Sequence, residues 1–296
     1  MEPLLQRLGR GDVLVADGAM GTMLFERGLR PGQCPEAVNL ERPELLEEIA
    51  GLYLDAGAEI IQTNTFGASP AKLAMYGLED RTSPINTHAA QAVRRAVGGR
   101  ALVSGSCGPS GRLLRPYGDA DPDDIFAGFR RQMQALIDAR VDLICVETMT
   151  DLTEATLAIK AAKEVSSDVP VMATMTFDPT PRGFFTIMGV SVEQAAAGLI
   201  DAGADVIGSN CGNGIENMVR IARQYRACTD HPLLIQSNAG MPKTQDDRLV
   251  YDDTPEFMAR KAKDLLAAGV SIIGGCCGTT PDHIRAISAV VDAARS

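Results

Sequence analysis

The stretch Ala267–Pro281, AAGVSIIGGCCGTTP, is the most informative about the fold, because its pattern contains the end of a helix, a strand and the start of the next helix. Its apolar run Ser271–Gly275 has the length and composition of a buried strand. Gly269 stands before this run, where glycine commonly ends a helix in the left-handed conformation. Thr280 and Pro281 follow as a hydroxyl cap and a proline at the first helical position.

The same succession repeats along the whole chain. The phrases DAGAE and DAGAD, at 55–59 and 201–205, resemble AAGVS and stand before further apolar runs. Amphipathic helical patterns lie between the runs, as in Pro43–Ala56 and Pro122–Ala139. Strands that alternate with helices form a parallel sheet, and eight repeats predict closure into a barrel. The eight predicted strands are Val13–Asp17, Ala58–Thr63, Ala101–Gly105, Asp142–Glu147, Pro170–Thr176, Asp205–Asn210, Pro232–Asn238 and Ser271–Gly275. We therefore expect an α/β protein, a single (β/α)8 TIM barrel.

Composition agrees with one barrel domain over residues 1–296. The chain is 45% hydrophobic, and α/β barrels routinely occupy about 250 residues as one domain. The formal net charge of −10 argues against nucleic acid or an anionic membrane as a partner. Neither a signal peptide nor an apolar run of membrane-spanning length is recognisable. Seven cysteines without an export signal indicate reduced thiols, and we expect a cytoplasmic protein.

Residues that can bind a metal or a polar substrate end or directly follow six of the eight predicted strands. Catalytic groups of such barrels lie at the C-terminal ends of the strands, so these residues are expected to converge. They are Asp17, Asn64, Glu147, Cys211, Asn238 and the pair Cys276-Cys277. This convergence predicts a site there, although Asp17-Gly18 is also typical of a turn and Glu147 could be structural.

Three of these residues, Cys211, Cys276 and Cys277, predict a zinc site with about one zinc per chain. Thiolates select zinc, and a catalytic zinc keeps a fourth position open. Neighbouring cysteines can face one ion only where the strand breaks, which the flanking glycines permit. Small buried thiols, or a phosphate cup formed by GGCCGTT, are the alternatives. Cys145 is expected in the core, and Cys34, Cys107 and Cys228 have no predicted role.

Other barrel chemistries are disfavoured by missing residues. None of the three histidines, His88, His231 and His283, ends a predicted strand, which argues against a hydrolase that binds its metal by histidine. No lysine lies in the sixth strand or at its end, which argues against a Schiff-base aldolase.

With these residues assembled, the chain resembles the homocysteine S-methyltransferase family, and especially the homocysteine-binding barrel of cobalamin-dependent methionine synthases. The motifs run in order along essentially the whole chain, and GGCCGTTP with an upstream NCG is the most specific. They are DGAMGT (Asp17–Thr22), QTNTFGAS (Gln62–Ser69), GLED (Gly77–Asp80), GPSG (Gly108–Gly111), ETMTD (Glu147–Asp151), SNCG (Ser209–Gly212), SNAG (Ser237–Gly240) and GGCCGTTP (Gly274–Pro281).

The resemblance implies a role for each site residue. Zinc would be bound by the three cysteines, with the homocysteine sulfur as fourth ligand, and Asn238 would hold the metal when substrate is absent. The carboxylates of Asp17 and Glu147 would lie near the substrate ammonium. Backbone amides around Gly18 and Ala19 would receive its carboxylate. Asn64 and Thr65 could orient the substrate or close their loop by hydrogen bonds.

The methyl donor is expected to come from outside this chain. The chain ends one helix after the eighth strand and has no D-x-H-x-x-G pattern, so methylcobalamin is expected only through a separate corrinoid protein. S-methylmethionine and betaine remain alternative methyl donors, and a thiol other than homocysteine remains an alternative acceptor. The chain could also be a piece of a longer enzyme. A zinc-binding subunit without turnover is a further alternative, but such a subunit needs no paired carboxylates facing the metal.

Overall fold

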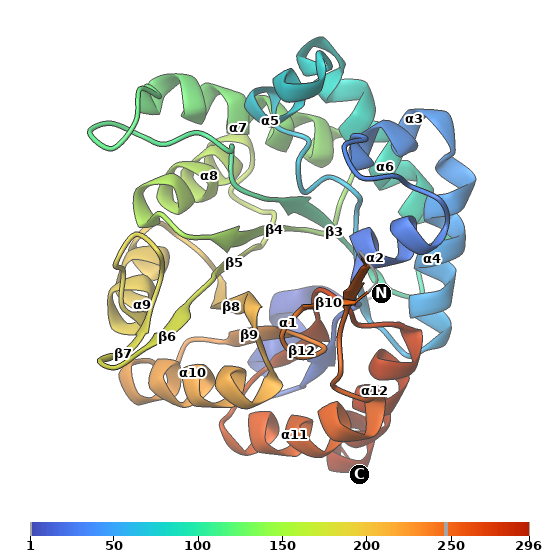
Figure 1. Cartoon of the computed structure of the whole chain (residues 1–296), viewed down its shortest axis with the longest axis vertical. Helices are drawn as coiled ribbons and strands as arrows, with labels where there is room; N and C mark the ends of the chain where they lie inside the picture. Colours follow the sequence, from blue (N-terminus) through green and yellow to red (C-terminus); the bar gives the residue numbers. More distant parts are fainter. Residues whose placement is uncertain (1, 246–247, 296) are drawn as a thin grey trace.

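The computed structural model describes residues 2–245 and 248–295, and it confirms the predicted barrel. All eight predicted strands are present in one fully parallel sheet (Figure 1). They are β1 (Leu14–Val15), β2 (Ile60–Gln62), β3 (Leu102–Cys107), β4 (Leu143–Met149), β5 (Val171–Met175), β8 (Val206–Gly214), β9 (Leu233–Asn238) and β12 (Ile272–Gly275). A parallel bridge from Ala16 to Ile60 joins β1 to β2 and completes the ring.

Helices surround the sheet and follow the strands in the predicted alternation (Figure 1). Each of the three predicted helix-ending glycines, Gly57, Gly203 and Gly269, has a positive φ. Thr254 caps its helix by accepting a hydrogen bond from the Phe257 amide. The helices are α1 (Leu4–Gly9), α2 (Met20–Glu26), α3 (Val38–Glu41), α4 (Pro43–Asp55), α5 (Pro70–Leu73), α6 (Thr82–Val97), α7 (Pro122–Asp138), α8 (Leu152–Val165), α9 (Val192–Asp201), α10 (Ile215–Cys228), α11 (Pro255–Ala267) and α12 (Pro281–Arg295), with 3-10 turns at Pro35–Ala37, Ala74–Tyr76 and Glu79–Arg81.

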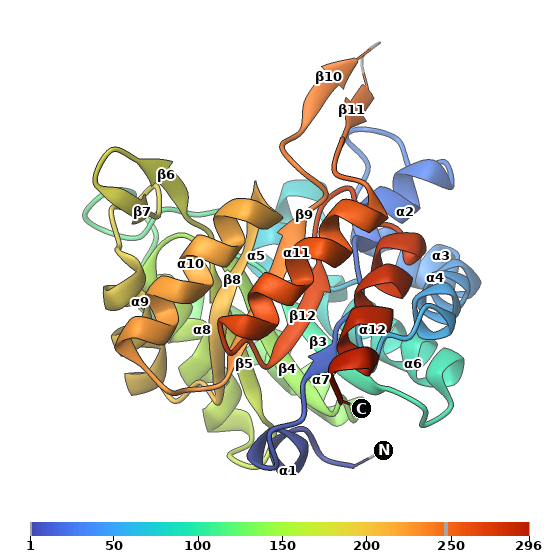
Figure 2. The same cartoon turned by 90° about the horizontal axis from the view of Figure 1, so that it is seen from below.

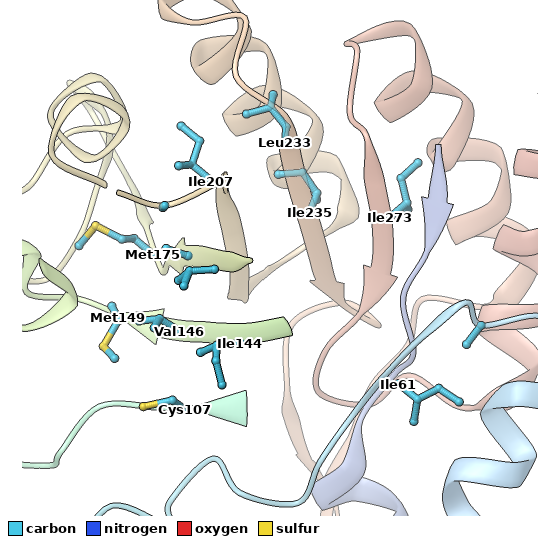
Figure 3. Close-up of a cluster of buried hydrophobic side chains, with 14 of the residues drawn as sticks. Ile61, Cys107, Ile144, Val146, Met149, Met175, Ile207, Leu233, Ile235 and Ile273 are labelled. Atoms are coloured by element: carbon cyan, nitrogen blue, oxygen red, sulfur yellow. The ribbon is translucent and has the colours of Figure 1, made fainter. Parts of the chain in front are cut away.

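Strand side chains alternate between the helices and the inside of the barrel. Those on the outer face, including Ile61, Ile207 and Ile273, form the main apolar core with the helices (Figure 3). A second cluster fills the N-terminal end of the barrel interior, where Leu4 of α1 closes it. Every strand contributes to this inner cluster, through Leu14, Ile60, Leu102, Leu143 with Cys145, Met172, Val206, Leu234 and Ile272.

Two small hairpins that the sequence analysis did not predict extend from the loops after β5 and β9. They are β6 (Asp178–Thr180) with β7 (Gly183–Phe185), and β10 (Lys243–Gln245) with β11 (Arg248–Val250). The second hairpin projects at the end of the barrel opposite α1 (Figure 2). None of the helices in the described ranges has both the length and the apolar character needed to cross a membrane.

Candidate metal and substrate site

The three predicted metal ligands meet at the C-terminal end of the barrel. The sulfurs of Cys211, Cys276 and Cys277 all lie within 4.8 Å of one another, and the first and last are 3.8 Å apart. Two thiolates bound tetrahedrally to zinc at about 2.3 Å would be separated by about 3.8 Å. The three sulfurs therefore have the chemistry and the spacing that a zinc ion requires.

Local backbone geometry brings these sulfurs to one point. Regular alternation directs Cys276 into the barrel, two residues after Gly274, while Cys277 follows after β12 has ended at Gly275. Cys211 has a φ of 58°, a left-handed conformation that is uncommon outside glycine. This conformation turns its side chain away from the direction that an extended strand would give. β12 thus ends before both cysteines, which is the condition stated above for their facing one ion.

The cluster favours the thiolate form at one of its members. Hydrogen bonds with Cys211 and Cys276 lower the pKa of Cys277 below its ordinary value. The shared hydrogen bonds with Cys211 and Cys277 raise the pKa of Cys276. Since the thiolate is the form that binds metals, the cluster holds one sulfur ready for a cation.

Asp17 and Glu147 are buried carboxyl groups at the ends of β1 and β4. Burial raises the pKa of Asp17 to about 8, and it raises the pKa of Glu147 to about 7. Neither has an ion-pair partner in the described part of the chain, and Oδ1 of Asp17 has no hydrogen-bond partner there. A buried carboxylate is costly without a cation, so this pair is suited to receive a positively charged ligand group.

Asn238, at the end of β9, also presents an unused polar atom. Its Oδ1 is buried and lacks a hydrogen-bond partner in the described residues.

The backbone amide of Ala19, predicted to receive the substrate carboxylate, already has a hydrogen-bond acceptor, because it donates to the Thr279 hydroxyl over 3.2 Å. Close packing explains why residue 18 is a glycine, because a Cβ at this position would lie 2.6 Å from that hydroxyl oxygen. The predicted substrate roles of Gly18 and Ala19 stay predictions.

The hydrogen bonds of Asn64 and Thr65 close their own loop. The Asn64 amide donates to the Pro35 carbonyl and to Oδ1 of Asn39, each over 2.8 Å. The Thr65 hydroxyl donates to the Ser106 carbonyl over 2.7 Å. These contacts are those of the loop-closing alternative, and a role in orienting substrate stays a prediction.

Sequence reasoning missed Asn210, which joins the carboxylate and the cysteines. Its side-chain amide donates to Oε2 of Glu147 over 3.2 Å and reaches the Cys276 sulfur at 3.9 Å. Its Oδ1 accepts from the Thr174 hydroxyl and the Thr148 amide. The sequence contained a signal for Asn210. Side chains alternate between the two faces of a strand, so Val206, Gly208 and Asn210 of β8 all face the barrel interior.

The other four cysteines lie outside this cluster. All seven cysteines of the chain are free thiols. Cys145 belongs to the inner apolar cluster, as predicted. Cys107, also buried, donates to Oε1 of Gln132 from the outer face of β3. Cys34 is buried beside Glu36, and Cys228 is exposed.

Comparisons with known proteins identify the family of the chain. A family model described as homocysteine S-methyltransferase matches residues 14–291. Methionine synthases of Mycobacterium leprae and Mycobacterium tuberculosis are 31% and 32% identical over 310 and 298 residues. The alignments cover 98% and 94% of this chain but only 25% and 24% of those proteins, so the chain spans about a quarter of their length.

Solved structures give the same result for the fold. The homocysteine methyltransferase MmuM from Escherichia coli in its metallated form is 27% identical, with a TM-score of 0.80 over 97% of this chain and 99% of that one. Its oxidized form matches equally well. The carboxyl transferase domain of Rhizobium etli pyruvate carboxylase, with oxamate and biotin, is 16% identical with a TM-score of 0.54, covering 96% of this chain and 47% of that one. That likeness concerns the fold alone.

Proposed function

The chain belongs to the homocysteine S-methyltransferase family, and on this premise we propose that it methylates the thiol of homocysteine at one bound zinc ion, giving methionine. The observation that carries the proposal is the cluster of three cysteine sulfurs within 4.8 Å at the C-terminal end of the barrel. The similar MmuM protein has been solved in a metallated form, which supports metal binding by this chain as well. Seven free thiols suit a reducing compartment such as the cytoplasm.

The other site residues would bind the amino-acid part of homocysteine. Asp17 and Glu147 would hold the ammonium, which supplies the cation that these buried carboxyl groups lack. Amides around Gly18 and Ala19 would receive the carboxylate, and Asn238 would occupy the metal before substrate arrives. For the Ala19 amide this requires exchange of its present acceptor, the Thr279 hydroxyl.

The reaction forms a carbon–sulfur bond and breaks the bond between the methyl group and its donor. Zinc bound to the cysteines would lower the pKa of the substrate thiol, so that the thiol loses its proton near neutral pH. The site residues would orient the sulfur toward the C-terminal end of the barrel, where the donor would arrive. The sulfur supplies the electron pair of the new bond, and the electrons of the broken bond stay with the donor.

The donor is proposed to be a methylcorrinoid carried by a separate protein. Large apolar side chains stand exposed on loops that follow four different strands, at Phe66, Leu113, Ile187 and Met241. Such side chains around one end of the barrel suit contact with a protein. The similarity to methionine synthases supports the same donor class. Diffusible S-methylmethionine or betaine is the alternative.

Metal analysis and X-ray absorption test the zinc and substrate assignments. The purified protein should hold about one zinc with three sulfur ligands, and homocysteine should add a fourth. A shell dominated by nitrogen would refute the cysteine assignment. An unchanged shell, while homocysteine demonstrably binds, would refute activation of the thiol by the metal.

A donor panel separates the candidates for the methyl source. Free methylcobalamin should methylate homocysteine slowly, and a corrinoid-loaded protein should do so faster, because docking supplies orientation. S-methylmethionine and betaine are run under the same conditions. Fast turnover with either, and none with any methylcorrinoid, would refute the donor proposal and leave the zinc and homocysteine assignments standing.

A further inference from the structure

The side chain of Asn210, which directly precedes Cys211 on β8, is buried and held in one orientation. Its Oδ1 accepts from the Thr148 amide over 2.8 Å and from the Thr174 hydroxyl over 2.7 Å. A backbone amide can only donate, so the atom that faces Thr148 must be the carboxamide oxygen. The nitrogen of Asn210 is therefore fixed on the other side of the group.

That nitrogen contacts both halves of the candidate site. It donates to Oε2 of Glu147 over 3.2 Å and to the Thr148 hydroxyl over 2.8 Å, and it reaches the Cys276 sulfur at 3.9 Å. The other oxygen of Glu147 accepts from the Ser106 hydroxyl over 2.5 Å. The Asn210 amide group thus touches a carboxyl group predicted to bind substrate and a sulfur predicted to bind metal.

Asn210 also adjoins irregular backbone on two strands. Only three residues other than glycine have a positive φ in the described part of the chain, and two of them are Thr148, at 61°, and Cys211, at 58°. Such backbone is costly for a β-branched residue and persists where its surroundings hold it. Asn210 holds Thr148 through its amide and its hydroxyl. Thr148 follows Glu147 where the pairing of β4 with β5 shifts register, and bulges of this kind redirect side chains.

We propose that Asn210 is a positioning residue that couples the two halves of the site. One amide group would orient Glu147 for the substrate ammonium and Cys276 for the metal. The inference rests on the proposed function, in which homocysteine reaches the metal with its sulfur and the carboxyl groups with its ammonium. The spacing between these two points must then be held. Changing a group that hydrogen-bonds to a metal ligand typically costs roughly 10- to 100-fold in metal affinity or activity.

Cobalt and homocysteine titrations test the two contacts separately. Co²⁺ in place of zinc gives an absorption band from its thiolate ligands. Wild type and Asn210→Ala are titrated with Co²⁺, then with Zn²⁺ against a chelator, and with homocysteine in a calorimeter. Asn210→Ala should keep three sulfur ligands, shift the cobalt–thiolate band, and weaken zinc and homocysteine binding about tenfold each.

Asn86→Ala is the matched control. Asn86 is a buried amide on α6 that donates to two backbone carbonyls, those of Ala68 and Thr82. This control should lower the melting temperature and keep the wild-type band and both affinities.

Thr174→Val is a milder variant, because it removes a donor to Oδ1 and keeps Asn210 itself. It should change the band and both affinities in the same direction by a smaller factor. Asn210→Ala is also combined with Glu147→Gln. Residues that act through one contact are not additive, so the double variant should lose less homocysteine affinity than the product of the two single losses. Losses that multiply would refute the coupling.

The outcomes separate this inference from the proposed function. Wild-type protein that binds no metal at its cysteines would refute the proposed function itself. A normal wild-type site, with Asn210→Ala identical to it in band position and both affinities, would refute only the role of Asn210. A loss confined to one of the two ligands would refute the coupling as well. Thermal unfolding checks each variant, and Thr174→Val decides the question if Asn210→Ala does not fold.

Discussion

The two ends of the barrel interior differ in what they contain, although the same strands build both. On β9, Leu234 belongs to the apolar cluster at the N-terminal end, and Asn238 four residues later has an unpartnered oxygen at the C-terminal end. On β4, Leu143 lies in the same apolar cluster, and Glu147 four residues later is a buried carboxyl group at the C-terminal end. The N-terminal end buries apolar surface, which stabilises the fold. The C-terminal end keeps polar groups with unused hydrogen-bonding capacity, which cost stability and are available to ligands.

This contrast predicts that mutations at different positions of a single strand should affect the free energy of unfolding and ligand binding separately. A change near the N-terminal end should alter the free energy of unfolding and leave the metal in place. A change at the C-terminal end should alter metal or substrate binding with a smaller effect on folding. Four experiments test this division, and they are given in order of decreasing expected effect.

Cys211→Ser should have the largest effect, because serine does not replace a thiolate ligand to zinc. We expect most of the zinc to be lost. Changing a group that hydrogen-bonds to a metal ligand typically lowers activity by up to roughly 100-fold, and loss of a ligand itself should lower the rate of methylation by more than this. Zinc analysis and an activity assay measure both. Cys228→Ser, at an exposed thiol outside the cluster, should keep zinc and activity. Full zinc content in Cys211→Ser would contradict the proposed role of the polar end in metal binding.

Leu234→Ala tests the apolar end. Leu234 is fully buried, and removing such a side chain typically costs about 2–5 kcal/mol in the free energy of unfolding. The melting temperature should fall by about 5 °C or more, while the folded protein keeps its zinc. Leu5→Ala, at a leucine that is 42% exposed on α1, should change little. Equal melting temperatures for the two variants would contradict the assigned role of the inner cluster.

Asp17→Asn tests substrate binding at the polar end. A charge-assisted contact to an ammonium is worth roughly 1.5–3 kcal/mol, so homocysteine affinity should fall about tenfold to a hundredfold. Glu147→Gln should behave in the same way, and both variants should keep their zinc. Calorimetric titration with homocysteine, beside metal analysis, measures this. Unchanged affinity would assign the altered residue to a structural role.

The smallest expected effect is the pH dependence of stability without substrate. Burial raises the pKa of Asp17 from 3.8 to about 8, so the folded state keeps a proton between these values that the unfolded state has lost. Stability should therefore fall as pH rises through this window, by at most about 1.4 kcal/mol per pH unit. Asp17→Asn should remove this contribution. Denaturant unfolding at pH 6 and pH 7 should show the smaller loss in the variant, and parallel losses would contradict the assignment.

Local patterns were enough to predict most of the fold and part of the site. The eight strands were recognised because a strand buried on both faces must be almost continuously apolar. The helix-ending glycines were recognised because left-handed backbone favours glycine. The residues following the strands could be selected because parallel strands place all their C-terminal ends on one side. The two hairpins were missed, since their short strands lie outside the barrel and lack that apolar pattern.

By itself, then, the sequence determined the alternation of strands and helices and the group of polar residues expected at one end of the barrel. Only the tertiary structure decided which atoms meet there. The left-handed backbone of Cys211 redirects a side chain that regular alternation would place differently. Asn210 contacts Cys276 across 66 positions of sequence, and Tyr251 reaches Gly278 from another loop. Such contacts depend on how distant segments pack together, and no local pattern of residue types encodes that packing.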